Sequence, residues 1–258
     1  MRKLFYIAAV ALLTLGTVSC QKEDSKDGSN NMNTDTTPNN PTNPMDTTTT
    51  PTILISWVDL GLPSGLLWAE CNLGATTPEE YGNYYAWGET WTKRVYTWTT
   101  YFYGDYDSES STYMMSKYNT REDYGTVDNK TTLEPSDDAA TVILGNGARI
   151  PTEVEWRELL NNTTSKWTTV NNVHGRKFTA TNGNSLFLPA AGNMDGSGLD
   201  AADGGGFYWT SSLAGDTDET YYYPNFACAL GFNSGKQLLS NSYYRYYGFS
   251  VRAVRSAH

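Results

Sequence analysis

The stretch from Ala148 to Leu160, with the sequence A-R-I-P-T-E-V-E-W-R-E-L-L, constrains the fold more than any other part of the chain. Thr152 is followed three residues later by Glu155, which is the spacing of a capping box, where each side chain satisfies a backbone N–H at a helix start. The apolar residues then recur at positions i, i+3 and i+4, namely Trp156, Leu159 and Leu160. This spacing predicts a helix that ends near Asn162 and buries one face in a core.

Residues 1–19 have the organisation of an export signal. Arg2 and Lys3 precede an apolar run over residues 4–18, and small residues lead to Cys20. This pattern is typical of a signal peptide, and the run is shorter than the ~20 residues that span a bilayer. The cysteine resembles that of a bacterial lipobox, which implies cleavage before Cys20 and attachment to a membrane by acyl chains such as palmitoyl. The alternative is an ordinary secretory signal followed by an unrelated cysteine.

Residues 20–52 are predicted to form a surface tether. Gln21-Lys22-Glu23-Asp24 resembles the surface-export signal of Bacteroides-type lipoproteins, which implies the outer face of the outer membrane; the alternative is a solvated linker. Residues 25–52 are rich in Asn, Thr, Pro and Asp and have almost no apolar side chains to bury, so we expect disorder. Thr36 and Thr47 lie in Asp-Thr-Thr sequences that resemble an O-glycosylation pattern, although chance also produces such pairs here.

Residues 53–258 are long enough for one domain with its own hydrophobic core. Removing Arg2 and Lys3 with the signal changes the formal net charge from −10 to −12. This acidity argues against nucleic acid as a partner and against electrostatic attachment to anionic lipid. Lipidation uses one of the three cysteines, which leaves Cys71 and Cys228 either as a disulfide or as two buried free thiols.

Short β-like stretches separated by turn signals favour an α+β or mainly β domain. The expected strands lie within 57–65, 66–74, 177–180, 185–192, 207–212, 221–232 and 243–255, with a hairpin turn at Asn182-Gly183-Asn184. Two further short helices are expected, one starting at Thr77, with Glu80 at its third position, and one within residues 136–140. Residues 89–129 form a long excursion with little periodicity and one strand.

Six motifs of the domain recur in the order found in one bacterial family. They are V-D-L-G-L-P-S-G (58–65), Y-A-W-G-E (85–89), the stretch at 148–160, L-P-A-A-G (188–192), Y-W-T-S-S (208–212) and Y-G-F-S-V-R-A-V-R (247–255). Together they resemble the Fibrobacter succinogenes major paralogous domain, which is common in surface lipoproteins of Bacteroides-like bacteria. The resemblance covers nearly all of residues 57–255 and implies a lipoprotein.

A more distant resemblance bears on the fold. Residues 149–156 are similar to a helix of formylglycine-generating enzymes, and residues 248–252 to their closing strand. This implies a C-type-lectin-like α+β fold, with two main short helices packed on small twisted antiparallel sheets and long loops. Those enzymes bind copper through two closely spaced cysteines, whereas Cys228 has no cysteine near it in the sequence. We therefore expect no enzyme of that family.

Metal-binding and other catalytic patterns are weak. Calcium-dependent lectins use a Trp-Asn-Asp strand, and this chain has Trp209-Thr210-Ser211 instead. The spacing of Asp195, Asp200 and Asp203 matches no calcium loop known to us, so we expect no cofactor, with Ca²⁺ as the alternative. Two carboxylate pairs are candidates for glycoside hydrolysis, but capping and helix dipoles explain them more simply: Glu153 with Glu155, and Asp137 with Asp138.

Aromatic residues supply the remaining functional signal. Five candidate ligand-binding residues lie among polar residues in the long excursion: Trp91, Tyr96, Trp98, Tyr101 and Tyr103. An aromatic face stacks on a sugar ring, and tyrosine adds a hydrogen bond. The alternative is that alternate members form the inner face of a strand.

These observations predict a lipid-anchored module of the bacterial cell surface that binds a glycan or a host or matrix protein without catalysis, as in adhesion. Two other classes of protein stay open. One is a structural or assembly subunit of a cell-envelope or fimbrial complex, with the aromatic residues in a protein interface. The other is an unrecognised carbohydrate-active enzyme.

Overall fold

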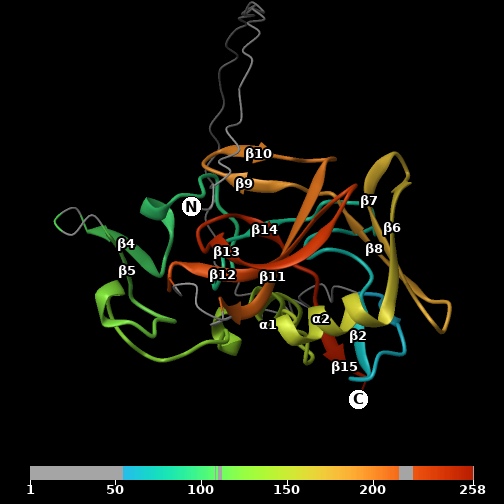
Figure 1. The fold of residues 1–258 in the computed structure, drawn as a ribbon, viewed down its shortest axis with the longest axis horizontal. Coiled ribbons are helices and arrows are strands. Elements are labelled where there is room, and N and C mark those ends of the chain that lie inside the picture. The colour runs from blue at the N-terminus through green and yellow to red at the C-terminus, as the bar shows by residue number, and fades with distance from the viewer. Residues whose placement is uncertain (1–54, 108, 110–111, 215–222, 258) are drawn as a thin grey trace, which may run out of the picture. The chain divides into compact units, whose positions relative to one another are not determined.

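The computed structural model describes residues 55–257 except 108, 110–111 and 215–222. The predicted signal, the tether, Cys20, Thr36 and Thr47 lie outside the described residues. Residues Pro51–His258 form one compact unit. Its described part is an α+β structure with two α-helices and several small β-sheets (Figure 1).

The predicted organising helix is α2, Glu153–Asn162, and its capping box forms with both hydrogen bonds. The Thr152 side chain accepts from the Glu155 backbone N–H at 3.3 Å, and the Glu155 carboxylate accepts from the Thr152 backbone N–H at 2.8 Å. Trp156 and Leu159 are fully buried. The prediction of this helix, with its end near Asn162, is therefore confirmed.

The other α-helix, α1, spans Ala139–Leu144 and follows a 3₁₀ turn, η3, at Pro135–Asp137. Asp138 caps it, because its carboxylate accepts from the backbone N–H of Thr141 at 2.9 Å. A second oxygen of Asp138 accepts from the backbone N–H of Ile150 at 2.8 Å, which ties α1 to the segment before α2.

A five-stranded sheet with the order β13-β12-β11-β14-β3 forms the centre of the domain (Figure 1). Its strands are β3 (Tyr84–Tyr85), β11 (Gly205–Leu213), β12 (Phe226–Asn233), β13 (Gln237–Tyr244) and β14 (Phe249–Ser250). β11 and β14 pair in parallel, and the other neighbours are antiparallel. A strand was expected within residues 243–255, but β13 begins earlier, at Gln237.

Four smaller antiparallel sheets surround this one. They comprise β1 (Trp57–Asp59), β2 (Leu66–Ala69) and β15 (Val254–Ser256); β6 (Thr163–Val170), β7 (Val173–Ala180) and β8 (Ser185–Pro189); β9 (Asn193–Asp195) and β10 (Gly198–Asp200); and β4 (Gly104–Asp107) and β5 (Thr112–Met115). β2 pairs with both β1 and β15, so the start and the end of the domain share one sheet.

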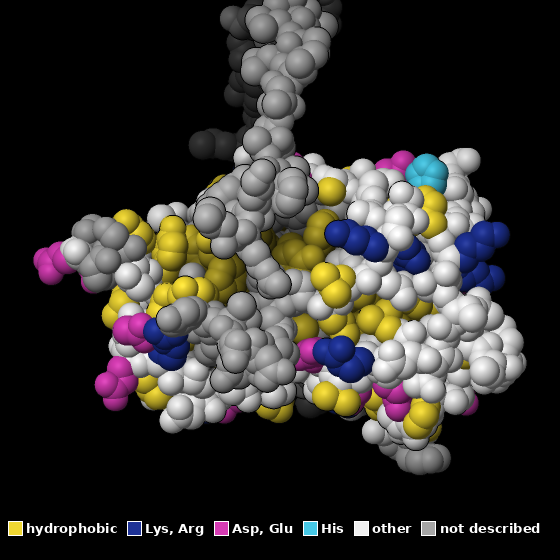
Figure 2. Space-filling view, in the orientation of Figure 1, with side chains coloured by type: hydrophobic (Ala, Val, Ile, Leu, Met, Phe, Trp, Pro, Cys, Tyr) yellow, Lys and Arg dark blue, Asp and Glu magenta, His cyan; other side chains and the backbone are white. Residues whose placement is uncertain are grey.

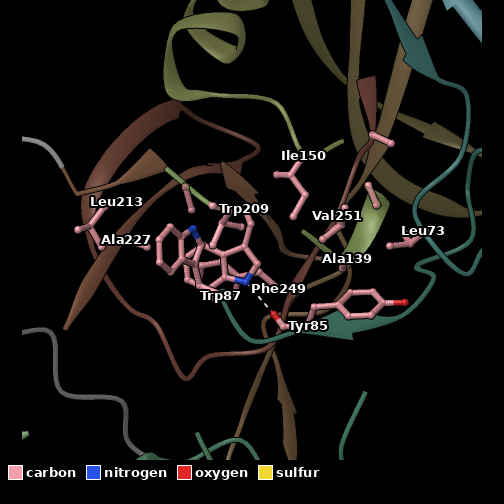
Figure 3. Close-up of a cluster of buried hydrophobic side chains, with 14 of the residues drawn as sticks. Leu73, Tyr85, Trp87, Ala139, Ile150, Trp209, Leu213, Ala227, Phe249 and Val251 are labelled. Carbon is pink, nitrogen blue, oxygen red and sulfur yellow. Dashed lines mark hydrogen bonds between the residues drawn. The ribbon is translucent and has the colours of Figure 1, made fainter. Parts of the chain in front are cut away.

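Side chains of the central sheet enter two hydrophobic clusters. Tyr208 lies in one cluster, where it packs with Trp156 and Leu159 of α2. Its neighbour Trp209 lies in the second cluster, because successive side chains of a strand point to opposite faces of the sheet. Figure 3 shows Trp209, Trp87 and Phe249 together in the latter, with Trp209 and Phe249 stacked at 4.2 Å. The Trp209 indole N–H donates to the carbonyl of Tyr85 at 2.7 Å, so these rings also satisfy buried polar groups.

Two local predictions were wrong. No helix begins at Thr77; instead the Glu80 carboxylate accepts from the backbone N–H groups of Thr76 and Thr77 at 2.6 and 3.2 Å, which closes a turn. The long excursion is more ordered than predicted, because it contains the β4–β5 hairpin and two 3₁₀ turns, η1 (Trp98–Thr100) and η2 (Glu122–Tyr124).

Candidate binding surface

The five aromatic residues predicted to bind a ligand do not share one exposed face. Tyr96, Trp98 and Tyr101 are only 2%, 7% and 4% exposed, which makes their prediction as ligand-binding residues wrong. Trp91 is 45% exposed, and Tyr103 is half-buried. Only Trp91 and Tyr103 of the predicted set therefore reach the surface.

Trp98 is buried because rings from three separate parts of the chain pack around it. It stacks on Tyr113 of β5 at 4.4 Å and meets the ring edges or faces of Tyr101, Tyr244 and Tyr246 at 5.7, 5.8 and 5.0 Å. Such aromatic pairs contribute about 0.5–1.5 kcal/mol beyond the area they bury. Trp98 thus holds the excursion against the end of β13.

The buried tyrosines also have hydrogen-bond partners. The Tyr101 hydroxyl donates to the carbonyl of Trp87 and accepts from Nε of Arg245, both at 2.8 Å. The Tyr96 hydroxyl donates to the carbonyl of Tyr84 at 2.6 Å, and burial raises the pKa of Tyr96 to about 12. These hydroxyls are engaged inside the protein and are not available to a ligand.

A buried carboxylate fixes the loop that carries Trp91. Glu89 is 1% exposed, and its Oε1 accepts from Lys93 Nζ and from the backbone N–H of Phe102, both at 2.8 Å. Lys93 Nζ also donates to the carbonyl of Thr100 at 2.9 Å. Both ends of the loop are therefore held by one ion pair.

Phe102 is the exposed residue that the sequence interpretation missed. It is 64% exposed, and its ring meets Trp91 edge-on at 5.3 Å and Tyr103 at 4.9 Å. Phe102 faces outward, whereas its neighbour Tyr101 is buried. We call Trp91, Phe102 and Tyr103 the Trp91 platform. More widely, Figure 2 shows hydrophobic side chains gathered over the part of the molecule where Figure 1 places β4, β5 and the adjoining end of β13.

The paired carboxylates considered for catalysis have structural partners. Glu155 accepts from both terminal nitrogens of Arg149, at 2.5 and 2.7 Å, and Glu153 forms an ion pair with Arg157. Asp137 accepts from Lys117 Nζ and the Tyr118 hydroxyl, each at 2.5 Å. In these hydrogen bonds Glu153, Glu155 and Asp137, like Asp138 at the start of α1, cap helices or close ion pairs.

The aspartates of the Gly-rich loop were weighed as calcium ligands. Asp203 accepts instead from the His174 backbone N–H at 3.0 Å and lies 2.9 Å from Nδ1 of the same residue. Within residues 55–257, apart from the gaps, no three His, Cys, Asp or Glu side chains come together in a way that would hold a metal ion.

Cys71 and Cys228 are free thiols, so the disulfide alternative is wrong. Their surroundings differ: Cys228 is buried on β12 beside Thr210 and Glu153, whereas Cys71 is half-buried after β2, near Arg252 and Glu70. Burial raises the pKa of both thiols, that of Cys228 to about 12. Both groups stay protonated at neutral pH.

No family model matches the chain, and neither does any curated protein or solved structure. No helix in the described part is long and apolar enough to cross a membrane.

Proposed function

We propose that the chain is a lipoprotein anchored by Cys20 to the outer face of a bacterial outer membrane, and that its domain binds a ligand without catalysis. The proposal includes membership of the Fibrobacter succinogenes major paralogous family and a C-type-lectin-like fold. Support for this fold comes from the small sheets around two short helices and from the pairing of β1 and β15 with β2. The ligand is a glycan or a host or matrix protein.

The exposure of Trp91 and Phe102 on a fixed loop carries this proposal. A large aromatic pair that stays in water gains free energy when a sugar ring or an apolar side chain covers it. The loop beneath is held by Glu89 and Lys93, so little conformational entropy is lost on binding. Thr92 is exposed in the same loop, and its hydroxyl can bond to a polar ligand.

The absence of catalysis is proposed on chemical grounds. A glycosidase of the usual type needs two carboxylates facing one another across the scissile bond. Glu153, Glu155, Asp137 and Asp138 instead bond to Arg157, Arg149, Lys117 and a helix start. The two described thiols are protonated at neutral pH, which makes them weak nucleophiles.

The test is a glycan array and a panel of matrix proteins probed with the purified chain from Gln21 to His258. Trp91→Ala and Phe102→Ala should each weaken binding at least about tenfold, or ~1.4 kcal/mol. Leu238→Ala is the matched control, because Leu238 is 59% exposed on β13, and it should leave binding unchanged.

Binding that survives both platform substitutions would remove the Trp91 platform from the proposal. A stoichiometric partner that co-purifies from the envelope, together with an absence of binding on the array and the matrix panel, would favour an assembly subunit instead.

The lipid anchor has its own test. Metabolic labelling with a clickable fatty acid should mark the wild type but not Cys20→Ser. Protease treatment of intact cells should remove the domain if it lies on the outer face.

A further inference from the structure

A cavity of about 490 Å³ opens beside Cys71. The loop after β2, strand β3 and the end of α1 surround it, and its apolar walls include Leu73, Tyr85, Ile143 and Leu144. Figure 3 shows Leu73 and Tyr85 together at one side of the hydrophobic cluster that contains Trp209, with the Tyr85 hydroxyl directed away from the tryptophan rings. Pockets of about 300–1,000 Å³ with mostly apolar walls are the usual size for small-molecule sites.

The walls of this cavity are held in place by hydrogen bonds. Arg252 is fully buried and donates to the carbonyls of Ala69 and Glu70 at 3.1 and 2.5 Å, and to Oδ1 of Asn72. The segment before β3 is tied to this loop, because the backbone N–H of Asn83 donates to the carbonyl of Leu73 at 2.9 Å. The cavity is therefore formed before any ligand arrives, which lowers the entropy cost of binding.

Gly74 lets the two sides approach closely. Its φ is +86°, and a Cβ atom there would lie 2.4 Å from the side-chain nitrogen of Asn83. The side chains of Asn83 and Tyr85 both line the cavity. One amide and one hydroxyl are therefore present at the cavity, where they can orient a single polar group of a ligand.

The electrostatics of the cavity select against charged ligands. Burial raises the pKa of the Cys71 thiol, so the thiol is neutral at pH 7. The neighbouring cation, Arg252, donates its hydrogen bonds to Asn72 and to main-chain carbonyls rather than into the cavity. Glu70 lines the cavity and opposes an anion. A cation would lose its hydration on the apolar walls, which costs several kcal/mol. The single, partly exposed carboxylate of Glu70 offsets little of this cost.

We propose that this cavity is a binding site for a small, uncharged and mostly apolar molecule that carries one hydroxyl or carbonyl group. The molecule would bury its apolar part against Leu73, Ile143 and Leu144 and bond to Asn83 or Tyr85. The site is separate from the Trp91 platform and does not depend on the function proposed for it.

The alkylation rate of Cys71 shows whether a ligand occupies the cavity, because Cys71 lines the cavity and is half-buried. The chain from Gln21 to His258 contains the compact unit with both hydrophobic clusters of the central sheet. In this chain, the rate of Cys71 alkylation by iodoacetamide is followed by peptide mass spectrometry. The probes are 2-naphthalenemethanol, 2-naphthoate and 2-naphthylmethylammonium, which share a ring system and differ in charge. The neutral alcohol should slow alkylation at least fivefold in a saturable manner and raise the melting temperature, and the two ions should do neither.

Ala75→Phe fills the cavity, since Ala75 is one of its lining residues, and should abolish protection by the alcohol. Val154→Phe is the matched control on the exposed face of α2, and the alcohol should still protect Cys71 in this variant. Melting curves and ligand-observed NMR line widths give a second reading in both variants, independent of the thiol. Three results would each overturn the proposal. The alcohol could fail both to slow alkylation and to raise the melting temperature, the ions could have the same effects as the alcohol, or the alcohol could protect Cys71 in Ala75→Phe as well as in the wild type.

Discussion

Arg252 donates two hydrogen bonds to the side-chain oxygen of Asn72, at 3.0 Å from Nε and 2.6 Å from Nη2. Both residues are buried, and Nη2 also donates to the carbonyl of Phe187 at 3.1 Å. One guanidinium therefore joins the loop after β2, the middle of β8 and the segment before β15. In these bonds the charge is balanced by main-chain carbonyls and an amide rather than by a carboxylate.

Arg252→Leu should lower the free energy of unfolding by about 3 kcal/mol or more. The substitution keeps an apolar stem but leaves the Asn72 oxygen and several carbonyls unpaired in the core, and each such group costs about 1–3 kcal/mol. Urea denaturation measures the change. Arg255→Leu is the comparison, since Arg255 is half-exposed over the Trp57 ring, and its loss should cost under about 1 kcal/mol. Equal losses in the two variants would contradict this account.

Thr152→Ala should cost about 1 kcal/mol of stability, because it removes the acceptor for the Glu155 backbone N–H at the start of α2. Val154→Ala, a change two residues further along at a side chain that is 74% exposed, should stay within about 0.5 kcal/mol. Thermal and urea unfolding of the two variants would decide. A Thr152→Ala protein as stable as the wild type would mean that water caps this helix equally well.

Glu155 should contribute to the loss of stability in acid. Burial alone would raise its pKa, but the hydrogen bonds from Arg149 and the Thr152 backbone N–H outweigh burial and hold the pKa below its ordinary 4.5. The folded state therefore prefers the carboxylate, so this stabilisation is complete above the unfolded pKa and is lost as the pH falls through the folded value.

In Glu155→Gln this part of the pH dependence is missing, so unfolding free energy measured against pH should fall less steeply below about pH 5 than in the wild type. Arg149→Met should flatten the profile in the same direction, because the Arg149 hydrogen bonds are a main cause of the lowered pKa. Parallel profiles for all three proteins would show that the ion pair does not form in solution.

The helix α2 and the hairpin of β7 and β8 could be predicted from the sequence because their signals are local. A capping box fixes one helix end, and Asn182-Gly183 specifies a tight turn. The strand β6 was missed, since its threonines and single tryptophan give a weak apolar alternation. The Asn171-Asn172 pair was a signal for the turn after β6 that was not used: both residues adopt positive φ, +47° and +67°, which asparagine tolerates better than most residues.

The candidate binding residues were harder to predict, because burial in the excursion is set by distant contacts. Nothing near Trp98 in the sequence indicates that Tyr244 and Tyr246 will cover it from the end of β13. Likewise, nothing near Trp91 indicates that its loop faces water. Composition correctly identified an aromatic-rich region, but which rings are core and which are surface depends on the tertiary structure.

Trp98 and Trp91 should therefore respond in opposite ways to truncation. Trp98→Ala removes a 7% exposed ring with four aromatic neighbours and should cost about 3–5 kcal/mol of stability. Trp91→Ala removes a half-exposed ring that packs edge-on against Phe102, and it should cost under about 1.5 kcal/mol. Urea denaturation followed by circular dichroism compares the two, since it does not depend on the fluorescence that each substitution removes. If Trp91→Ala proved the more destabilising, Trp91 would be a structural residue, and the aromatic surface proposed for ligand binding would lose its central member.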